Sequence, residues 1–107
     1  MKVNELRIGN YVKSKRHDLD VVTQVGKSNV WGKFNEDIFP MPMPLTEEWL
    51  MKFGFEPNSN NQYRLKSRLI VIRDGVFTDY GSNVQLINVH QLQNFYFALT
   101  GEELTIK

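Results

Sequence analysis

The chain has 107 residues, of which 41% are hydrophobic and 23% charged, a composition that is typical of a globular domain and excludes a disordered chain. It contains no cysteine, so disulfides, thiolate metal sites and cysteine nucleophiles are excluded. Its 13 basic and 12 acidic residues give a net charge of +1, too little for a general attraction to nucleic acid.

The charge is spread unevenly along the chain. Residues 1–33 hold seven basic and three acidic residues, whereas residues 34–60 hold one and five. A local basic face on the first third is therefore allowed. No apolar run approaches the roughly 20 residues that span a bilayer, and the start, MKVNELRIGN, lacks the apolar core of a signal peptide. We expect a soluble, cytoplasmic protein without membrane contact.

Short strands are predicted in the first third. Residues 7–13, 20–25 and 29–34 are rich in Val, Ile, Tyr and Trp, and each stretch is followed by turn formers (SKRHD, GKS and NED). Strands this short can protect their edges by curling into a small barrel or by pairing with the rest of the chain. The pattern LRIGNYV followed by VVTQV resembles the opening of small SH3-like barrels.

Alternating prolines in FPMPMPLTEEWL precede a short helix predicted over residues 47–53. Thr46 can cap this helix, Leu45 and Leu50 can form a hydrophobic staple, and Gly54 can end it by letting Phe55 fold back onto Leu50. The prolines favour a stiff spacer. A proline-motif ligand is the alternative, but the acidic flanks do not suit many of its reader domains.

The second half is predicted to be a β-meander followed by a helix. The tract at residues 56–62, EPNSNNQ, has the composition of a loop, and strands follow in YRLK, RLIVIR, VFTDY and NVQLINV. Asp74-Gly75 predicts a tight type I′ hairpin turn. Asn88, Gln91 and Gly101 can cap and end the last helix. Its expected apolar face has three- and four-residue spacing: Val89, Leu92, Phe95, Tyr96 and Leu99.

These patterns together predict an α+β fold. An SH3-like antiparallel β module over residues 1–40 is followed by a helix–β-meander–helix unit over residues 41–107, and the two are expected to pack as one compact body because each is small.

In PLTEEWLMKFGF and VHQLQNFYFALTGEEL, together with the start NELRIGNYV, the chain resembles a family of small uncharacterised proteins of gut Bacteroidales, their phages and mobile elements. The resemblance covers nearly the whole chain. It implies a phage or prophage accessory role but no particular activity, and it brings no catalytic residues, because packing or capping explains every residue in these blocks.

Candidate catalytic and metal-binding groups are few. His17 and His90 lie far apart without partners at metal-ligand spacing, and each is read as a solvated or capping residue. Asp18 and Asp20 form a D-x-D pair that turn chemistry and solubility explain better than a metal site. Glu102 and Glu103 follow a helix end and are expected to face water. The sequence has no nucleotide-binding, hydrolase or zinc-protease motif, so we expect neither an enzyme nor a cofactor.

Binding of a macromolecule is the remaining class of function. Protein binding is the first hypothesis, with Phe95 and Phe97 as candidate contacts to a partner or to a second copy of the chain. The alternative is nucleic-acid binding by the first module. There the turn residues Lys13, Lys15 and Arg16 would meet phosphates next to the strand aromatics Tyr11, Trp31 and Phe34, of which Tyr11 and Trp31 would stack on bases. A solvated turn, with Tyr11 and Trp31 in the barrel core, explains the same residues.

Overall fold

The computed structural model describes residues 5–27, 29–34, 37–38, 40–59 and 61–107. The elements follow the order β1 (Tyr11–Val12), β2 (Asp20–Val25), β3 (Val30–Gly32), β4 (Asp37–Ile38), α1 (Glu47–Lys52), β5 (Glu56–Ser59), β6 (Gln62–Leu65), β7 (Arg68–Arg73), β8 (Val76–Asp79), β9 (Gln85–Leu86) and α2 (Val89–Thr100). They form two antiparallel sheets, in the orders β1-β2-β3-β4 and β5-β6-β7-β8-β9. The predicted α+β class is confirmed.

The N-terminal sheet has a small apolar core of its own. Successive side chains of a strand point to opposite faces of the sheet, and those on the inner face contribute to this core. The buried residues are Leu6, Val12, Val22, Val30 and Ile38. Strand β4 was not predicted; it pairs with β3 through Val30 and Ile38. The backbones of Lys13, just after β1, and Met41, beyond β4, form a bridge that joins the two edges of the sheet. The finer SH3-like assignment stays a prediction.

Helix α1 begins and ends as its sequence predicts. The Thr46 hydroxyl accepts a hydrogen bond of 3.3 Å from the backbone N–H of Trp49. At the other end Gly54 has φ +97°, and the Phe55 N–H donates to the Leu50 carbonyl at 3.0 Å. This reversal is a Schellman motif, and it turns Phe55 back into the core.

The five-stranded sheet is built on the predicted hairpin. Asp74 and Gly75 both have positive φ, and Arg73 pairs directly with Val76 across the two-residue loop. The prediction of a loop over residues 56–62 is wrong in part, because β5 occupies Glu56–Ser59. Among the described strands β5 pairs with β6 alone, so it lies at the edge of the sheet, where a proline such as Pro57 is tolerated.

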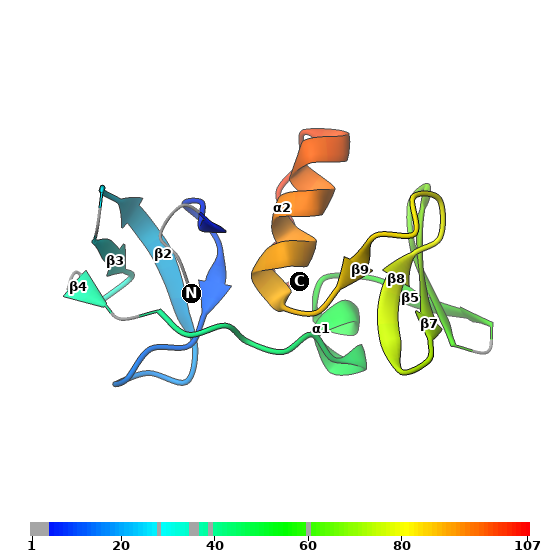
Figure 1. Ribbon diagram of the computed structural model, residues 1–107, viewed down its shortest axis with the longest axis horizontal. Helices are drawn as coiled ribbons and strands as arrows, with labels where there is room; N and C mark the ends of the chain where they lie inside the picture. The colour runs from blue at the N-terminus through cyan, green and yellow to red at the C-terminus, as the bar shows by residue number, and fades with distance from the viewer. Residues whose placement is uncertain (1–4, 28, 35–36, 39, 60) are drawn as a thin grey trace.

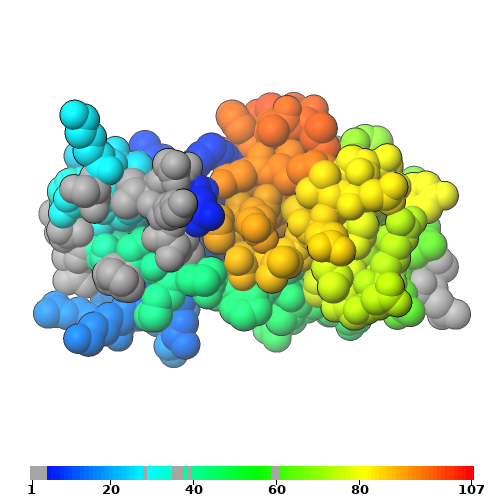
Figure 2. All heavy atoms as spheres, viewed as in Figure 1, coloured from blue at the N-terminus to red at the C-terminus, as the bar shows by residue number. Residues whose placement is uncertain are grey.

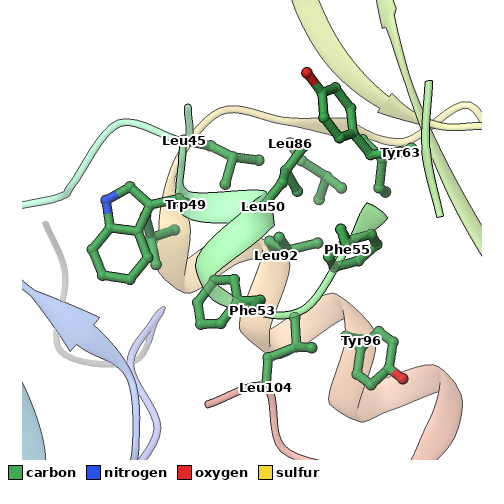
Figure 3. Close-up of a cluster of buried hydrophobic side chains, with 12 residues drawn as sticks. Leu45, Trp49, Leu50, Phe53, Phe55, Tyr63, Leu86, Leu92, Tyr96 and Leu104 are labelled. Carbon is green, nitrogen blue, oxygen red and sulfur yellow. The ribbon is translucent and has the colours of Figure 1, made fainter. Parts of the chain in front are cut away.

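Helix α2 packs on this sheet and on α1 over a larger apolar core (Figure 3). The core residues are Leu45, Trp49, Leu50, Phe53, Phe55, Tyr63, Ile70, Leu86, Val89, Leu92, Tyr96 and Leu104. Leu99 was expected on the buried face but is 51% exposed, because it lies in the last turn of the helix. Phe95 is half-buried against the core.

Helix α2 stands between the two sheets, and the proline segment runs from one part to the other (Figure 1). The molecule is elongated, with extents of 41 × 25 × 24 Å. The proline segment is hydrogen-bonded at both of its ends. Met41 exchanges backbone hydrogen bonds with Lys13, and the Met43 carbonyl accepts from the Val89 N–H at 2.8 Å. Pro42 and Pro44 are exposed, whereas Met41 and Met43 are half-buried.

Candidate binding surfaces

The basic turn after β1 lies on the surface, as expected. Lys13, Lys15 and Arg16 are all exposed. Ser14, between them, is buried, and its backbone exchanges hydrogen bonds with that of His17 across a tight turn. The turn thus presents three exposed cations on a backbone held by two hydrogen bonds.

The two aromatic residues assigned to this surface are placed differently. Tyr11 lies on the face of β1 opposite to Val12 and packs against the larger core, with ring centroids 5.6 Å from Trp49 and 5.9 Å from Phe53. Its hydroxyl accepts a hydrogen bond from the Ile106 N–H at 3.2 Å. Tyr11 therefore joins the two parts of the molecule, and it fills neither the barrel core nor a base-stacking site. Trp31 is half-buried.

An aromatic contact that the sequence did not reveal lies beside the basic turn. The rings of His17 and Phe34 stack with centroids 3.7 Å apart, and the Lys33 ammonium lies 5.1 Å from the centre of the Phe34 ring. Phe34 is still 49% exposed. This stack places Lys33 and Phe34 next to the cations of the turn.

Asp20 is not a solvated turn residue, contrary to expectation. Its carboxylate is fully buried at the start of β2 and accepts hydrogen bonds from the backbone N–H groups of Val21 at 2.8 Å and Lys33 at 2.9 Å. Gly32 makes room for it: a β-carbon there would lie 2.6 Å from Oδ2 of Asp20. These hydrogen bonds of Asp20 thus connect the end of β3 to β2. Asp18, by contrast, is exposed.

A polar joint between α2 and the N-terminal segment was missed from the sequence. Gln93, which is fully buried, accepts from the Tyr11 N–H at 2.7 Å and donates to the carbonyls of Gly9 at 3.0 Å and Leu104 at 3.2 Å. The Asn94 amide accepts from the buried Asn10 side chain and donates to the Glu5 carbonyl at 2.8 Å.

One signal in the sequence could have revealed this joint. Gln93 lies four residues after Val89 and three before Tyr96, so it interrupts the apolar face with a polar group that needs partners.

A second contact between the parts is ionic. The Arg7 guanidinium binds both carboxylate oxygens of Glu103, with its shortest contact at 2.8 Å, and lies 4.3 Å from the centre of the Phe97 ring. Phe97 therefore has an intramolecular partner, although it is 40% exposed. Phe95 and Phe97 point to different sides of α2 and do not form one patch.

An open hollow of about 400 Å³ lies between the N-terminal segment, α2 and β9. Its described walls are Glu5, Val84, Gln85, Leu86, His90, Gln91, Asn94 and Phe95. In Figure 2, α2 (orange) lies between the N-terminal module and the yellow β8–β9 region. The hollow therefore brings the predicted partner residue Phe95 together with Glu5, from the N-terminal segment, and with residues around β9.

His90 in this wall is buried, so the expectation of a solvated or capping residue is wrong. The side chain is 3% exposed, and among the residues that the structure describes its Nδ1 atom has no hydrogen-bond partner. Burial lowers the pKa of His90, and the negative charge of Glu5 only partly opposes this effect. At pH 7 the imidazole is therefore neutral.

At the far end of the five-stranded sheet, Asp79 is buried in a structural ion pair. Its carboxylate binds Arg68 Nη2 at 2.9 Å and accepts hydrogen bonds from the hydroxyl and N–H of Ser82. Burial acts to raise the pKa of Asp79, but the bonds from Arg68 and Ser82 outweigh it and hold the pKa below its ordinary value. This pair fixes the turn before β9.

Among the described residues, no group of three His, Asp or Glu side chains could hold a metal ion. The same part of the chain contains no helix with the length and apolarity to cross a bilayer. No protein family, curated protein or solved structure matches the chain.

Proposed function

We propose that the protein is a non-enzymatic accessory protein of a phage or mobile element that acts by binding another protein. The partner docks at the hollow between α2 and β9. The observation that carries this proposal is that apolar and polar side chains line the hollow together. Apolar groups of Val84, Leu86 and Phe95 lie beside the polar groups of Gln85 and His90, as is typical of concave recognition sites.

Apolar side chains in the wall of the hollow, and next to it in sequence, are exposed to solvent. Val84 is 39% exposed and Ile87, the residue after β9, is 59% exposed. The cores of protein–protein interfaces are typically rich in aromatic and aliphatic groups and poor in charged groups. The cytoplasmic location and the phage context rest on the sequence and on the family resemblance described above.

The proposal is tested by comparing proteins retained by the wild type and by two lysine variants in a host lysate. Val84→Lys places a charge in the hollow, and Met51→Lys places the same charge on α1, where Met51 is 50% exposed. We expect one set of proteins to be retained by the wild type and by Met51→Lys but lost with Val84→Lys. Equal retention by all three would contradict docking at the hollow.

Nucleic-acid binding by the N-terminal module is the second candidate, and the stack of His17 and Phe34 favours it. The stack holds an exposed aromatic ring beside Lys15, Arg16 and Lys33, and bases stack on such rings in single-strand-binding proteins. In this version Phe34 takes the role first assigned to Tyr11 and Trp31.

Salt dependence tests this second candidate. If Lys13, Lys15 and Arg16 contact phosphates, the logarithm of affinity for single strands should fall with that of salt at a slope of about −2, from roughly −0.7 per contact. Replacing all three by Ala should flatten the slope, and Phe34→Leu should weaken binding without changing the slope. Absence of salt-sensitive binding at low ionic strength would reject this candidate.

A further inference from the structure

We propose that the edge of β9 in the hollow pairs with an extended segment of the partner protein, through main-chain hydrogen bonds to Gln85. The inference rests on the proposed function and names the chemistry by which the partner is recognised. Three features of the molecule carry it: the direction of the Gln85 backbone groups, the pairing of the proline segment with the same edge, and the hollow beside that edge.

The backbone groups of Gln85 point away from the sheet. Strand β9 ends the order β5-β6-β7-β8-β9, and its register with β8 places Gln85 opposite Thr78. The Asp79 N–H donates to the Val84 carbonyl at 2.9 Å, so in this antiparallel pair the residues on either side of Thr78 and Gln85 make the hydrogen bonds. The N–H and C=O of Gln85 therefore face the open edge, where no described residue bonds to them.

The same edge already accepts an extended segment further along the chain. The Ile87 carbonyl accepts a hydrogen bond from the Leu45 N–H at 2.8 Å, and Pro44 and Asn88 form an antiparallel bridge. After Leu45 the chain turns into α1, so this pairing stops before Gln85. Backbone pairing is thus a contact that the edge uses within the fold, and a segment of another protein can continue it.

The hollow provides room for such a segment. Val84, Gln85 and Leu86 all line it, although successive side chains of a strand point to opposite faces, so the edge of β9 itself forms part of the wall. An added strand lies about 4.8 Å from its neighbour, on the side where Asn94 and Phe95 of α2 also line the hollow. A volume of about 400 Å³ suits a short extended segment rather than a folded surface.

The register determines which side chains the segment needs. The partner residue that pairs with Gln85 places its side chain on the same face of the sheet as Gln85, which is exposed. Its two neighbours point to the other face, where Leu86 packs into the core that α2 covers and Phe95 adds apolar surface. We therefore expect the segment to carry apolar residues on both sides of one polar residue.

Hydrogen exchange measured by NMR tests the open edge. In the protein alone, the Gln85 amide should exchange fast and the Asp79 amide, which is bonded to Val84, should exchange slowly. A nine-residue peptide with Val-Thr-Val at its centre and Gly and Ser on both sides should shift the signals of Val84, Gln85 and Phe95 and slow the exchange of the Gln85 amide. Protection of Gln85 in the protein alone, or no shift at Gln85 with millimolar peptide, would overturn the inference.

Methylation of the peptide backbone separates strand pairing from side-chain packing. A methyl group on the amide nitrogen of the central Thr removes the hydrogen bond to the Gln85 carbonyl, so binding should weaken about 5- to 160-fold, the cost of leaving that group unpaired. The matched control carries the methyl group on the amide of the preceding Val, whose N–H points away from β9, and should bind nearly as well as the parent peptide. Equal weakening by the two methyl groups would refute pairing at Gln85.

Two substitutions at Gln85 test its N–H group. Gln85→Pro removes this donor from the open edge, where proline leaves the ladder with β8 intact, whereas Gln85→Ala removes only an exposed side chain. The peptide should bind Gln85→Ala like the wild type and Gln85→Pro more weakly, and equal binding would refute the role of this donor. If Gln85→Pro does not fold, exchange and methylation decide. Loss of the partner with Val84→Lys, together with no peptide effect at Gln85, would reject the inference and leave the proposed function standing.

Discussion

Replacing Gln93 by Leu should loosen the joint between the two parts of the molecule. The side chain is fully buried and its amide makes three hydrogen bonds, at 2.7, 3.0 and 3.2 Å, to backbone groups of Tyr11, Gly9 and Leu104. Leucine is close to glutamine in size, so the substitution removes the hydrogen bonds and leaves little empty volume.

The expected loss of stability follows from the groups left unpaired. The Tyr11 N–H and the carbonyl of Leu104, whose residue is 2% exposed, lose their partner in a place that water hardly reaches, whereas half-buried Gly9 stays accessible. A buried group without a partner costs roughly 1–3 kcal/mol, and the greater apolarity of leucine offsets part of this, so we expect a loss of about 3 kcal/mol.

Urea denaturation followed by circular dichroism and by tryptophan fluorescence measures this loss. Gln85→Leu is the matched control, because Gln85 is exposed and its replacement should change the free energy of unfolding by no more than about 0.5 kcal/mol. Trp31 lies in the N-terminal sheet and Trp49 in the larger core, so the fluorescence signal reports on both parts of the molecule. A loss below about 1 kcal/mol for Gln93→Leu would refute the role assigned to this amide.

Three further substitutions or conditions test other contacts. Gly32→Ala should destabilise the N-terminal sheet by about 1–3 kcal/mol in thermal or urea unfolding, because its β-carbon would overlap the Asp20 carboxylate. Asp79→Asn should weaken the pairing with Arg68 and lower the melting temperature at pH 7. Because the pKa of Asp79 is below its unfolded value of 3.8, the stability it contributes is present above that pH and is lost as pH falls through the folded pKa. His90 also has a lowered pKa, so stability should decrease as pH falls below its unfolded value of 6.5, and His90→Phe should remove this decrease in pH-dependent unfolding experiments.

Local signals predicted most elements because each signal acts within a few residues. Thr46 and Gly54 bound α1, and Asp74-Gly75 forms the hairpin turn, since capping and turn geometry depend on neighbouring backbone groups. Strand β5 was missed for a physical reason. Its residues, EPNS, have no strand preference, and their conformation is set by pairing with β6.

The candidate surfaces were harder to predict because they depend on distant contacts. The basic turn was placed correctly on the surface, and Phe34 was named among the aromatic residues near it, but its stack with His17 was not predicted. Burial of His90 and Asp20 could not be predicted from their neighbours in sequence, because it depends on distant residues: Lys33 donates to Asp20, and Glu5 lies with His90 in the wall of the hollow. Tyr11 was assigned to the barrel core or to a stacking site, whereas the alternation of β1 directs it into the other part of the molecule.

The hollow and the joint between the two parts share residues, so a ligand in the hollow should act on the joint. Asn94 and Glu5 both line the hollow, and the Asn94 amide donates to the Glu5 carbonyl at 2.8 Å across the joint. If the ligand binds only when the joint is closed, the ligand stabilises the closed form. Because coupling is reciprocal, closing of the joint strengthens ligand binding by the same factor. A ligand concentration of 100 times the dissociation constant should then raise the free energy of unfolding by about 2.7 kcal/mol. Gln93→Leu should weaken ligand binding by the same factor by which it lowers the fraction of molecules with a closed joint. A partner protein that binds Gln93→Leu and the wild type equally well would show that the hollow forms without the joint.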